Sequence, residues 1–203
     1  MKRSVLIFYK LVFAALALVA IAAQLLHSTQ LANFNMVNFF SFFTIESNIF
    51  AATLFLISAY VLWAGKRNAT LDYLRGAATL YMLVTGIIYT TLLASGQNTL
   101  LLPWVNAVLH YLFPVIVLLD WLLDPPAQAL SYKKALLWLI YPLVYLTYSL
   151  VRGPIAQWYP YPFIDVSMNG YRSVAVNSVV IAVGVTALIL VVARLPRLNR
   201  RAS

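Results

Sequence analysis

The sequence predicts an all-α membrane protein, built as a bundle of six transmembrane helices. The chain has 203 residues, of which 63% are hydrophobic and only 9% are charged, and its mean hydropathy is +0.86. A water-soluble domain carries about a quarter charged residues, so an ordinary soluble globule and a disordered chain are both excluded. Apolar runs of about 20 residues, long enough to cross the hydrocarbon core, recur along the chain without the alternation of barrel strands.

The expected spans follow one another with short connections. We place them at about residues 5–26, 43–64, 71–94, 101–123, 133–151 and 174–193. The connections at 65–70, 95–99 and 124–131 are turn-rich or amphipathic, and the longer outer segment 152–172 contains three prolines. No internal repeat stands out, so residues 1–203 are interpreted as a single six-helix domain.

The distribution of lysine and arginine predicts the orientation. On this topology one side carries only Arg152 and Arg172, and the other side carries twelve cations: Lys2, Arg3, Lys10, Lys66, Arg67, Arg75, Lys133, Lys134, Arg194, Arg197, Arg200 and Arg201. The positive-inside rule then makes both termini cytoplasmic. If the source is prokaryotic, the expected membrane is the inner or plasma membrane. Topology and anionic headgroups account for the net charge of +9, so no nucleic-acid partner is expected.

The first span has an alternative interpretation as a cleavable signal peptide. Lys2 and Arg3 precede an apolar stretch, and Ala20-Ile-Ala22 lies before Ala23 in the manner of a cleavage site. Cleavage would leave five spans and an outer N-terminus. The even alternation of charged and uncharged loops favours retention of the helix.

Polar side chains at membrane depth are the candidate functional residues. A charge near a helix centre costs about 2.5–3.5 kcal/mol, so retained polar groups indicate a site. The chain has no cysteine, so any chemistry falls to hydroxyls, imidazoles, carboxylates or amides, and no metal or cofactor is expected. The candidates in the spans, or directly before the second span, are Asn38, Ser41, Thr44, Glu46, Ser47, Asn48, Thr85, Tyr89, Thr90, Thr91, Asn106, His110, Asp120 and Asn177.

Thr44 and His110 are the pair that depth brings together. Counted at 1.5 Å per residue from outer ends near Asn38 and Leu100, Thr44 lies about 9 Å deep and His110 about 15 Å deep. Helix tilt can absorb the difference, so the two can meet in the outer half of the bilayer. Each also has a purely structural interpretation, because membrane threonines bond their own backbone and buried imidazoles bond neighbouring helices.

The charged residues near the membrane need partners. Glu46 is the only glutamate in the chain and must be protonated, paired or exposed to water. Its candidate partners are the two outer cations, Arg152 and Arg172. At the inner end of the fourth span two aspartates are expected to pair with the lysines of the next loop, that is, Asp120 and Asp124 with Lys133 and Lys134.

The outer segment has two interpretations. Residues 158–163, Trp-Tyr-Pro-Tyr-Pro-Phe, form either an aromatic belt at the membrane interface or, with Asp165 following, a stiff lid over the mouth of the bundle. Glu46, Arg152, Asp165 and Arg172 are therefore expected to have substrate-binding or structural roles.

Three sequence features resemble a known family. Residues 43–48 read Phe-Thr-Ile-Glu-Ser-Asn, a lone histidine lies within the fourth span, and residues 152–163 read Arg-Gly-Pro-Ile-Ala-Gln-Trp-Tyr-Pro-Tyr-Pro-Phe. Together they resemble the androgen-induced gene 1 and androgen-dependent TFPI-regulating protein family, in particular its prokaryotic six-helix branch. The eukaryotic members are transmembrane threonine hydrolases that cleave fatty acid esters of hydroxy fatty acids. The resemblance implies that Thr44 is the nucleophile and His110 its partner.

The expected activity is therefore ester hydrolysis by a Thr44–His110 dyad through an acyl-threonine intermediate. Its partners are a long-chain fatty acid ester, the fatty acid product and membrane lipids. A carboxylate product would be drawn to Arg152 or Arg172, and the cavity walls would be the phenylalanines around Thr44 and the leucines of spans three and four. Candidate oxyanion donors are Ser47, Asn48, Asn106 and Asn177.

Two other functions remain open at this point. Glu46, His110 and Asp120 can instead form the proton or cation path of a small transporter or channel, although the chain lacks the matching broken helices of a carrier. The third alternative is a non-catalytic membrane scaffold.

Overall fold

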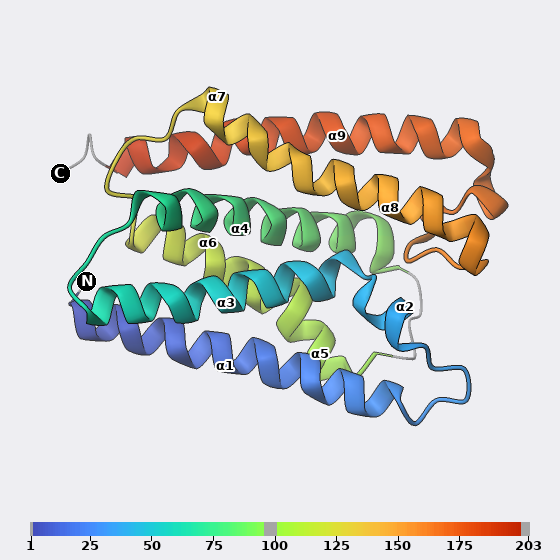
Figure 1. Cartoon of the computed structure of the whole chain (residues 1–203), viewed down its shortest axis with the longest axis horizontal. Coiled ribbons are helices and arrows are strands. Elements are labelled where there is room, and N and C mark those ends of the chain that lie inside the picture. Colours follow the sequence, from blue (N-terminus) through green and yellow to red (C-terminus); the bar gives the residue numbers. More distant parts are fainter. Residues whose placement is uncertain (1, 96–100, 200–203) are drawn as a thin grey trace.

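A computed structural model describes residues 2–95 and 101–199, and these residues form helices and no strand. Figure 1 shows the bundle, in which six helical spans are long and apolar enough to cross a membrane, as predicted. They are α1 (Arg3–Ser28), α3 (Phe43–Trp63), α4 with η1 (Ala69–Ile88, Tyr89–Leu93), α5 with η2 and α6 (Pro103–Ala107, Val108–Leu112, Phe113–Leu123), α7 with η3 and α8 (Tyr132–Ala135, Leu136–Leu139, Ile140–Ala156) and α9 (Val166–Asn199). The short helices α2 (Met36–Phe40) and η4 (Pro162–Ile164) lie in the connections.

The last span begins earlier than predicted. The Asp165 carboxylate accepts hydrogen bonds from the backbone N–H groups of Ser167 (2.8 Å) and Met168 (3.2 Å), so it caps the first turn of α9. The helix then kinks at Gly170, whose φ of 71° lies in the left-handed region. Of the two roles expected for Asp165, substrate binding and structure, these bonds give it the structural one.

Small residues set the closest helix packing. Ala14 and Ala17 of α1 and Ala51 and Ala52 of α3 are fully buried in one apolar cluster. Alanine lets two membrane helices approach closely, where van der Waals contact replaces the hydrophobic effect that lipid does not supply. α4 packs against α3, α6 and α9, while α8 and α9 lie at the periphery of the bundle.

The bundle has two distinct ends. α1 begins and α9 ends at the same end, which we call the terminal end, and we call the opposite end the site end (Figure 1). The structure does not place a membrane, so the cytoplasmic location of the termini stays a prediction. Arg200, Arg201 and most of the predicted connection 95–99 lie outside the described residues.

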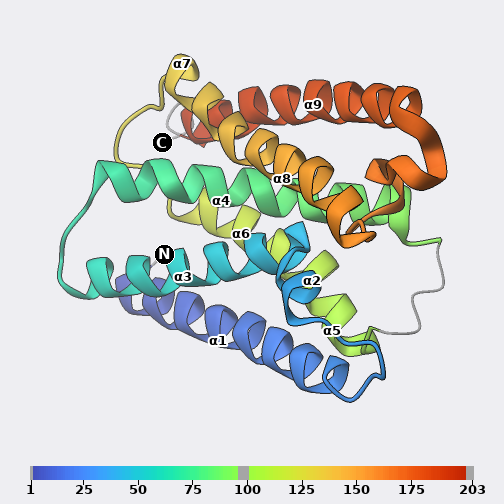
Figure 2. The ribbon, with the colours of Figure 1, turned by 45° about the vertical axis from the view of Figure 1, so that its right-hand side comes forward.

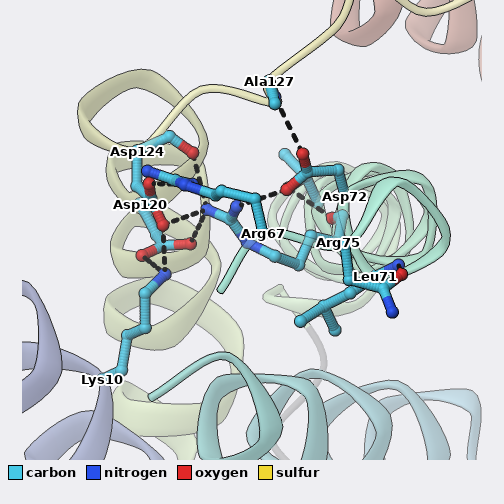
Figure 3. Close-up of polar contacts among 10 residues, drawn as sticks. Lys10, Arg67, Leu71, Asp72, Arg75, Asp120, Asp124 and Ala127 are labelled. Atoms are coloured by element: carbon cyan, nitrogen blue, oxygen red, sulfur yellow. Dashed lines mark hydrogen bonds and ion pairs between the residues drawn. The ribbon is translucent and has the colours of Figure 1, made fainter. Parts of the chain in front are cut away.

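A buried group of charges joins α1, α4 and α6 at the terminal end (Figure 3). Arg75 Nη2 lies 2.8 Å from Asp120 and 3.1 Å from Asp124, and Lys10 bonds Asp120 as well. Arg67 Nη1 lies 2.7 Å from Asp124. The charged cluster comprises three cations and three carboxylates, namely Lys10, Arg67, Arg75, Asp72, Asp120 and Asp124.

The predicted partners of the two aspartates were wrong. Asp120 and Asp124 pair with cations of α1, α4 and the connection before α4, and not with the lysines of the following loop. The reason is depth, since Asp120 is only 2% exposed and needs a cation that is buried with it. Lys10, which the sequence places among the cytoplasmic cations, is fully buried and fills that role.

Candidate active site

Thr44 and His110 meet near the site end of the bundle. The Thr44 Oγ1 atom lies 3.2 Å from the Nε2 atom of the His110 ring, and both residues are buried. The residues come from α3 and η2, 66 positions apart in the chain. A hydroxyl and an imidazole at this separation are within hydrogen-bond reach, the geometry of an activated nucleophile and its base.

Thr44 occupies the first turn of α3. Two non-helical residues, Ser41 and Phe42, form the break between α2 and α3 directly before this turn. The first N–H groups of a helix have no partner within it. Here tyrosine hydroxyls accept them: the Phe43 N–H donates to Tyr145 and the Thr44 N–H donates to Tyr161, each at 3.2 Å. Two phenols from distant segments therefore hold the backbone that carries Thr44.

His110 lies in a π-helical turn that ends just before Pro114. Proline has no N–H to donate to the carbonyl four residues earlier, so the helix widens at this point, and such π turns are frequent at functional sites. Gly86 of α4 makes room for the turn: a Cβ there would lie 3.3 Å from both the His110 carbonyl oxygen and Pro114 Cβ. The wide turn brings the imidazole toward α3.

An aromatic ring orients the imidazole. Tyr89, in the π turn η1, stacks on His110 with ring centroids 3.9 Å apart and an angle of 22° between the planes. Asn106 fixes the phenol, because its Nδ2 donates to the Tyr89 hydroxyl at 2.7 Å. His110 Nδ1 has no partner of standard geometry among the described residues, although the ring interacts with the backbone carbonyl of Asn106.

The expected oxyanion donors on α3 serve the scaffold instead. Both amide hydrogens of Asn48 are used, by the carbonyl oxygens of Thr44 (2.8 Å) and Leu109 (3.3 Å). The Ser47 hydroxyl bonds to the hydroxyl of Thr85 at 2.9 Å and to the Thr44 carbonyl at 3.2 Å. These bonds lock the first turn of α3 against α4 and η2.

The two other expected donors differ in position. Asn106 lines a cavity at the site. Its amide nitrogen donates a hydrogen bond to the Tyr89 hydroxyl. Asn177 lies outside the residues that line either cavity at Thr44, and its amide donates to the Phe163 carbonyl at 3.2 Å. Asn177 therefore anchors the outer segment to α9.

Sequence reasoning missed Tyr161. Its hydroxyl lies 3.4 Å from Thr44 Oγ1, and its ring packs edge-on against Phe42. Burial raises the pKa of the Tyr161 phenol, so the hydroxyl keeps its proton at neutral pH. Because its oxygen already accepts the Thr44 N–H, that proton is available to an oxygen atom placed at Thr44. The 158–163 segment therefore covers the site, as the lid interpretation proposed.

A row of tyrosines on α8 was also missed, although the sequence carries a signal for it. Tyr141, Tyr145 and Tyr148 recur at intervals of four and three, which puts them on one helix face. Tyr145 donates to the Ser41 carbonyl at 2.9 Å, and the Tyr148 hydroxyl lies 2.7 Å from Ser41 Oγ. The row clamps the break between α2 and α3.

The predicted arginine partners of Glu46 were wrong. Glu46 accepts a hydrogen bond from Tyr141, a neutral partner within the membrane-spanning part of the bundle. Arg152 instead donates to Asn38 Oδ1 at 2.5 Å and lies over the Trp158 ring at 5.4 Å. Arg172 is exposed on α9. Glu46, His110 and Asp120 bond to different partners and form no common cluster.

Two cavities border Thr44 among the described residues. The larger, of about 770 Å³, is lined by the connection before α2, by α5 and η2 and by the 158–162 segment, and it includes His110. The smaller, of about 100 Å³, is apolar and lies among α4, η1, α8 and α9. Its walls come from spans three, five and six. The expected phenylalanines around Thr44 and leucines of spans three and four occur in the larger lining, as Phe39, Phe42, Leu92, Leu93 and Leu109. The residues common to both linings are Thr44, Tyr89, Leu93 and Tyr161.

Neither a family model, nor a curated protein, nor a solved structure matches this chain.

Proposed function

We propose that the protein is an integral membrane hydrolase that cleaves esters of long-chain fatty acids with Thr44 as nucleophile and His110 as base. One observation carries the proposal: the 3.2 Å approach of Thr44 Oγ1 to His110 Nε2 where two cavities meet. A structural threonine bonds its own helix, but Thr44 Oγ1 has partners only on other segments among the described residues.

The reaction follows from the hydrogen-bond geometry. With a proton on Nδ1, His110 Nε2 accepts the Thr44 hydroxyl proton as Oγ1 bonds to the ester carbonyl carbon. The bond from that carbon to the alcohol oxygen then breaks, and His110 returns the proton to the leaving alkoxide. Water attacks the resulting acyl-threonine, His110 takes the water proton, and the proton ends on Thr44 Oγ1 as the fatty acid leaves.

Tyr161 supplies the donor to the developing oxyanion in this proposal. It lies beside the nucleophile, and its proton is not committed to the Thr44 backbone. A donor aimed at the charge of the transition state is worth about 10²–10³-fold in rate. Asn106, on the same side as His110, is positioned to hold the leaving group or the attacking water.

The resemblance noted above suggests fatty acid esters of hydroxy fatty acids as one substrate class. The lysine and arginine distribution places both termini in the cytoplasm and the site in the extracytoplasmic half of the membrane. Reporter fusions at each end of the chain test this orientation. We expect a cytoplasmic reporter to be active at both ends and a periplasmic reporter at neither.

Hydrolysis of 4-nitrophenyl palmitate by protein purified in detergent micelles tests the activity. We expect T44A to lose at least about 10³-fold in kcat/KM, in the range for removal of a catalytic nucleophile. A fluorophosphonate should label the wild-type protein at Thr44, as located by peptide mapping, and should leave T44A unlabelled.

T79A is the matched control. Thr79 is a buried α4 threonine whose hydroxyl bonds its own helix at the Arg75 carbonyl, so its loss should leave turnover unchanged. Turnover of T44A within tenfold of wild type would overturn the proposal. Proton or solute flux into liposomes that needs His110 but not Thr44 would favour the transporter alternative.

A further inference from the structure

The two cavities at Thr44 differ in chemistry. In the smaller, the polar side chains are already bonded: Ser178 to its own helix at the Val174 carbonyl, Thr85 to Ser47 and Tyr145 to the Ser41 carbonyl. The rest of its lining is almost entirely aliphatic and aromatic. Apart from the hydroxyls of Thr44, Tyr89 and Tyr161, which it shares with the larger cavity, it offers nothing to a polar ligand and is suited to a hydrocarbon chain.

The larger cavity has no charged residue in its described lining and more polar side chains than the smaller one. Its described lining contains no aspartate, glutamate, lysine or arginine. Amides and an indole contribute instead, from Asn33, Asn35, Asn38, Asn106 and Trp158. The oxygens of Asn35 and Asn38 already accept hydrogen bonds, whereas the buried Oδ1 of Asn106 has no partner among the described residues. Amides that both donate and accept hydrogen bonds suit hydroxyl groups, which do the same.

The position of His110 decides which part of an ester enters which cavity. Thr44 and Tyr161 border both cavities, whereas His110 borders only the larger one. The proton taken from Thr44 must reach the leaving oxygen, so the alcohol part of the ester has to lie on the side of His110. Water for the second step must also come from that side. The acyl chain is left with the apolar side.

We propose that the smaller cavity binds the acyl chain and the larger one binds a neutral, hydroxyl-bearing alcohol, so that the substrates are long-chain esters of polar alcohols such as glycerol. This inference rests on the proposed function, because it assumes that Thr44 accepts the acyl group. It goes further by assigning the two halves of the ester to named cavities and by setting the class of the leaving group.

The positions of the cavities along the bundle agree with this assignment. The larger cavity is walled by connections and helix ends at the site end, among them residues 31–35, whereas the smaller reaches Leu139 at the end of η3 and Val185 within α9. Figures 1 and 2 both show α8 diverging from α9 toward the site end. Leu143, 45% exposed on α8, borders the smaller cavity, so a long chain can extend between these helices into lipid.

Chain-length selectivity tests the acyl cavity. A182W fills it, and V183W places the same indole on the neighbouring position of α9, which is 65% exposed and outside the cavity. We expect A182W to lower kcat/KM for 4-nitrophenyl palmitate at least about tenfold relative to 4-nitrophenyl acetate, since bulk in a pocket discriminates by chain size. V183W should leave the palmitate-to-acetate ratio unchanged.

The ratio separates the inference from the proposed function. Wild-type protein that hydrolyses neither ester overturns both. Hydrolysis of both esters with an unchanged ratio in A182W overturns the acyl assignment alone. I181W obstructs another part of the same wall, so if A182W fails to fold, the ratio in I181W decides in the same way.

A panel of leaving groups tests the larger cavity. Three palmitate esters in the same mixed micelles are compared: 1-palmitoylglycerol, the palmitate ester of hydroxystearic acid, and cetyl palmitate. We expect the glycerol ester to have the highest kcat/KM, by about tenfold, because an apolar alcohol leaves Asn106 Oδ1 without the hydrogen bond that a hydroxyl group supplies. A rate for the wax ester or for the acid-bearing ester equal to that for the glycerol ester would overturn the assignment.

Discussion

The charged cluster at the terminal end and the Thr44–His110 site at the other end are both buried, polar and shared by neighbouring helices, yet their bonding differs. In the charged cluster, ions of opposite sign are paired, and Arg75 alone contacts three carboxylates. At the site the groups are neutral and border cavities. Buried polarity alone therefore does not mark function. The Thr44–His110 site differs from the charged cluster because its polar groups border cavities that a ligand can enter.

The comparison predicts opposite costs of mutation. A paired buried ion leaves an uncompensated charge when its partner is removed, so damage to the charged cluster should reduce stability. A neutral hydroxyl or imidazole beside a cavity can be exchanged with little loss of folding energy, so damage to the site should reduce turnover. The following predictions test this separation, from the largest expected effect to the smallest.

H110Q should abolish turnover while leaving the fold intact. Glutamine keeps hydrogen-bonding groups near Thr44 but cannot act as a base at neutral pH, so we expect kcat to fall at least about 10³-fold. The midpoint of thermal unfolding in detergent should stay within a few degrees of wild type. An H110Q protein that unfolds readily would mean that the imidazole is a structural link like Arg75.

D120A should have the reverse effect. Loss of this carboxylate leaves Lys10 and Arg75 short of a partner, which costs about 3–5 kcal/mol for a buried pair. Chemical denaturation followed by circular dichroism measures the loss, and K66A, at an exposed lysine, is the control. Activity per folded molecule should equal wild type, and a selective loss of activity would connect the two ends functionally.

Y161F should slow the reaction without weakening binding. Removal of an oxyanion donor lowers kcat about 10²-fold, and KM should change little because the donor acts on the transition state. Y81F is the matched control, since the Tyr81 hydroxyl bonds the Trp138 carbonyl away from both cavities. A rise in KM with kcat preserved would make Tyr161 a lid residue only.

The charged cluster should also show a pH dependence. Burial alone would raise the pKa of Asp124, but Arg75, Lys10 and Arg67 hold it below its usual value. A carboxylate whose pKa is lower in the folded than in the unfolded state stabilises the fold fully at pH values above the unfolded-state pKa of about 3.9. This contribution is lost as the pH falls through the folded-state pKa. Unfolding midpoints of wild type and D124N should therefore differ most at neutral pH and converge below about pH 4.

The sequence predicted what depends on hydropathy and on rarity. Six apolar runs locate the spans. The polar motif of residues 43–48 and the single histidine within the fourth span mark the pair that the structure joins, Thr44 and His110. The sequence did not predict the contacts that depend on how each helix is rotated about its own axis. Glu46 meets Tyr141 and Asp120 meets Lys10 because particular faces of helices distant in sequence turn toward one another. Tyr161 was missed because no periodicity indicates how a proline-rich connection folds back.

The tyrosine hydroxyls at the start of α3 have a consequence for biosynthesis. The groups that hold the backbone of Thr44 come from Tyr145 and Tyr161, 102 and 117 residues further along the chain than the N–H groups they accept. A nascent chain that has inserted only its first four spans already contains Thr44 and His110, but not the phenols that bond the first turn of α3. The proposed dyad therefore acquires its geometry only after the fifth span and the segment that follows it have been made, and under the proposed function an unfinished chain does not hydrolyse the lipids around it.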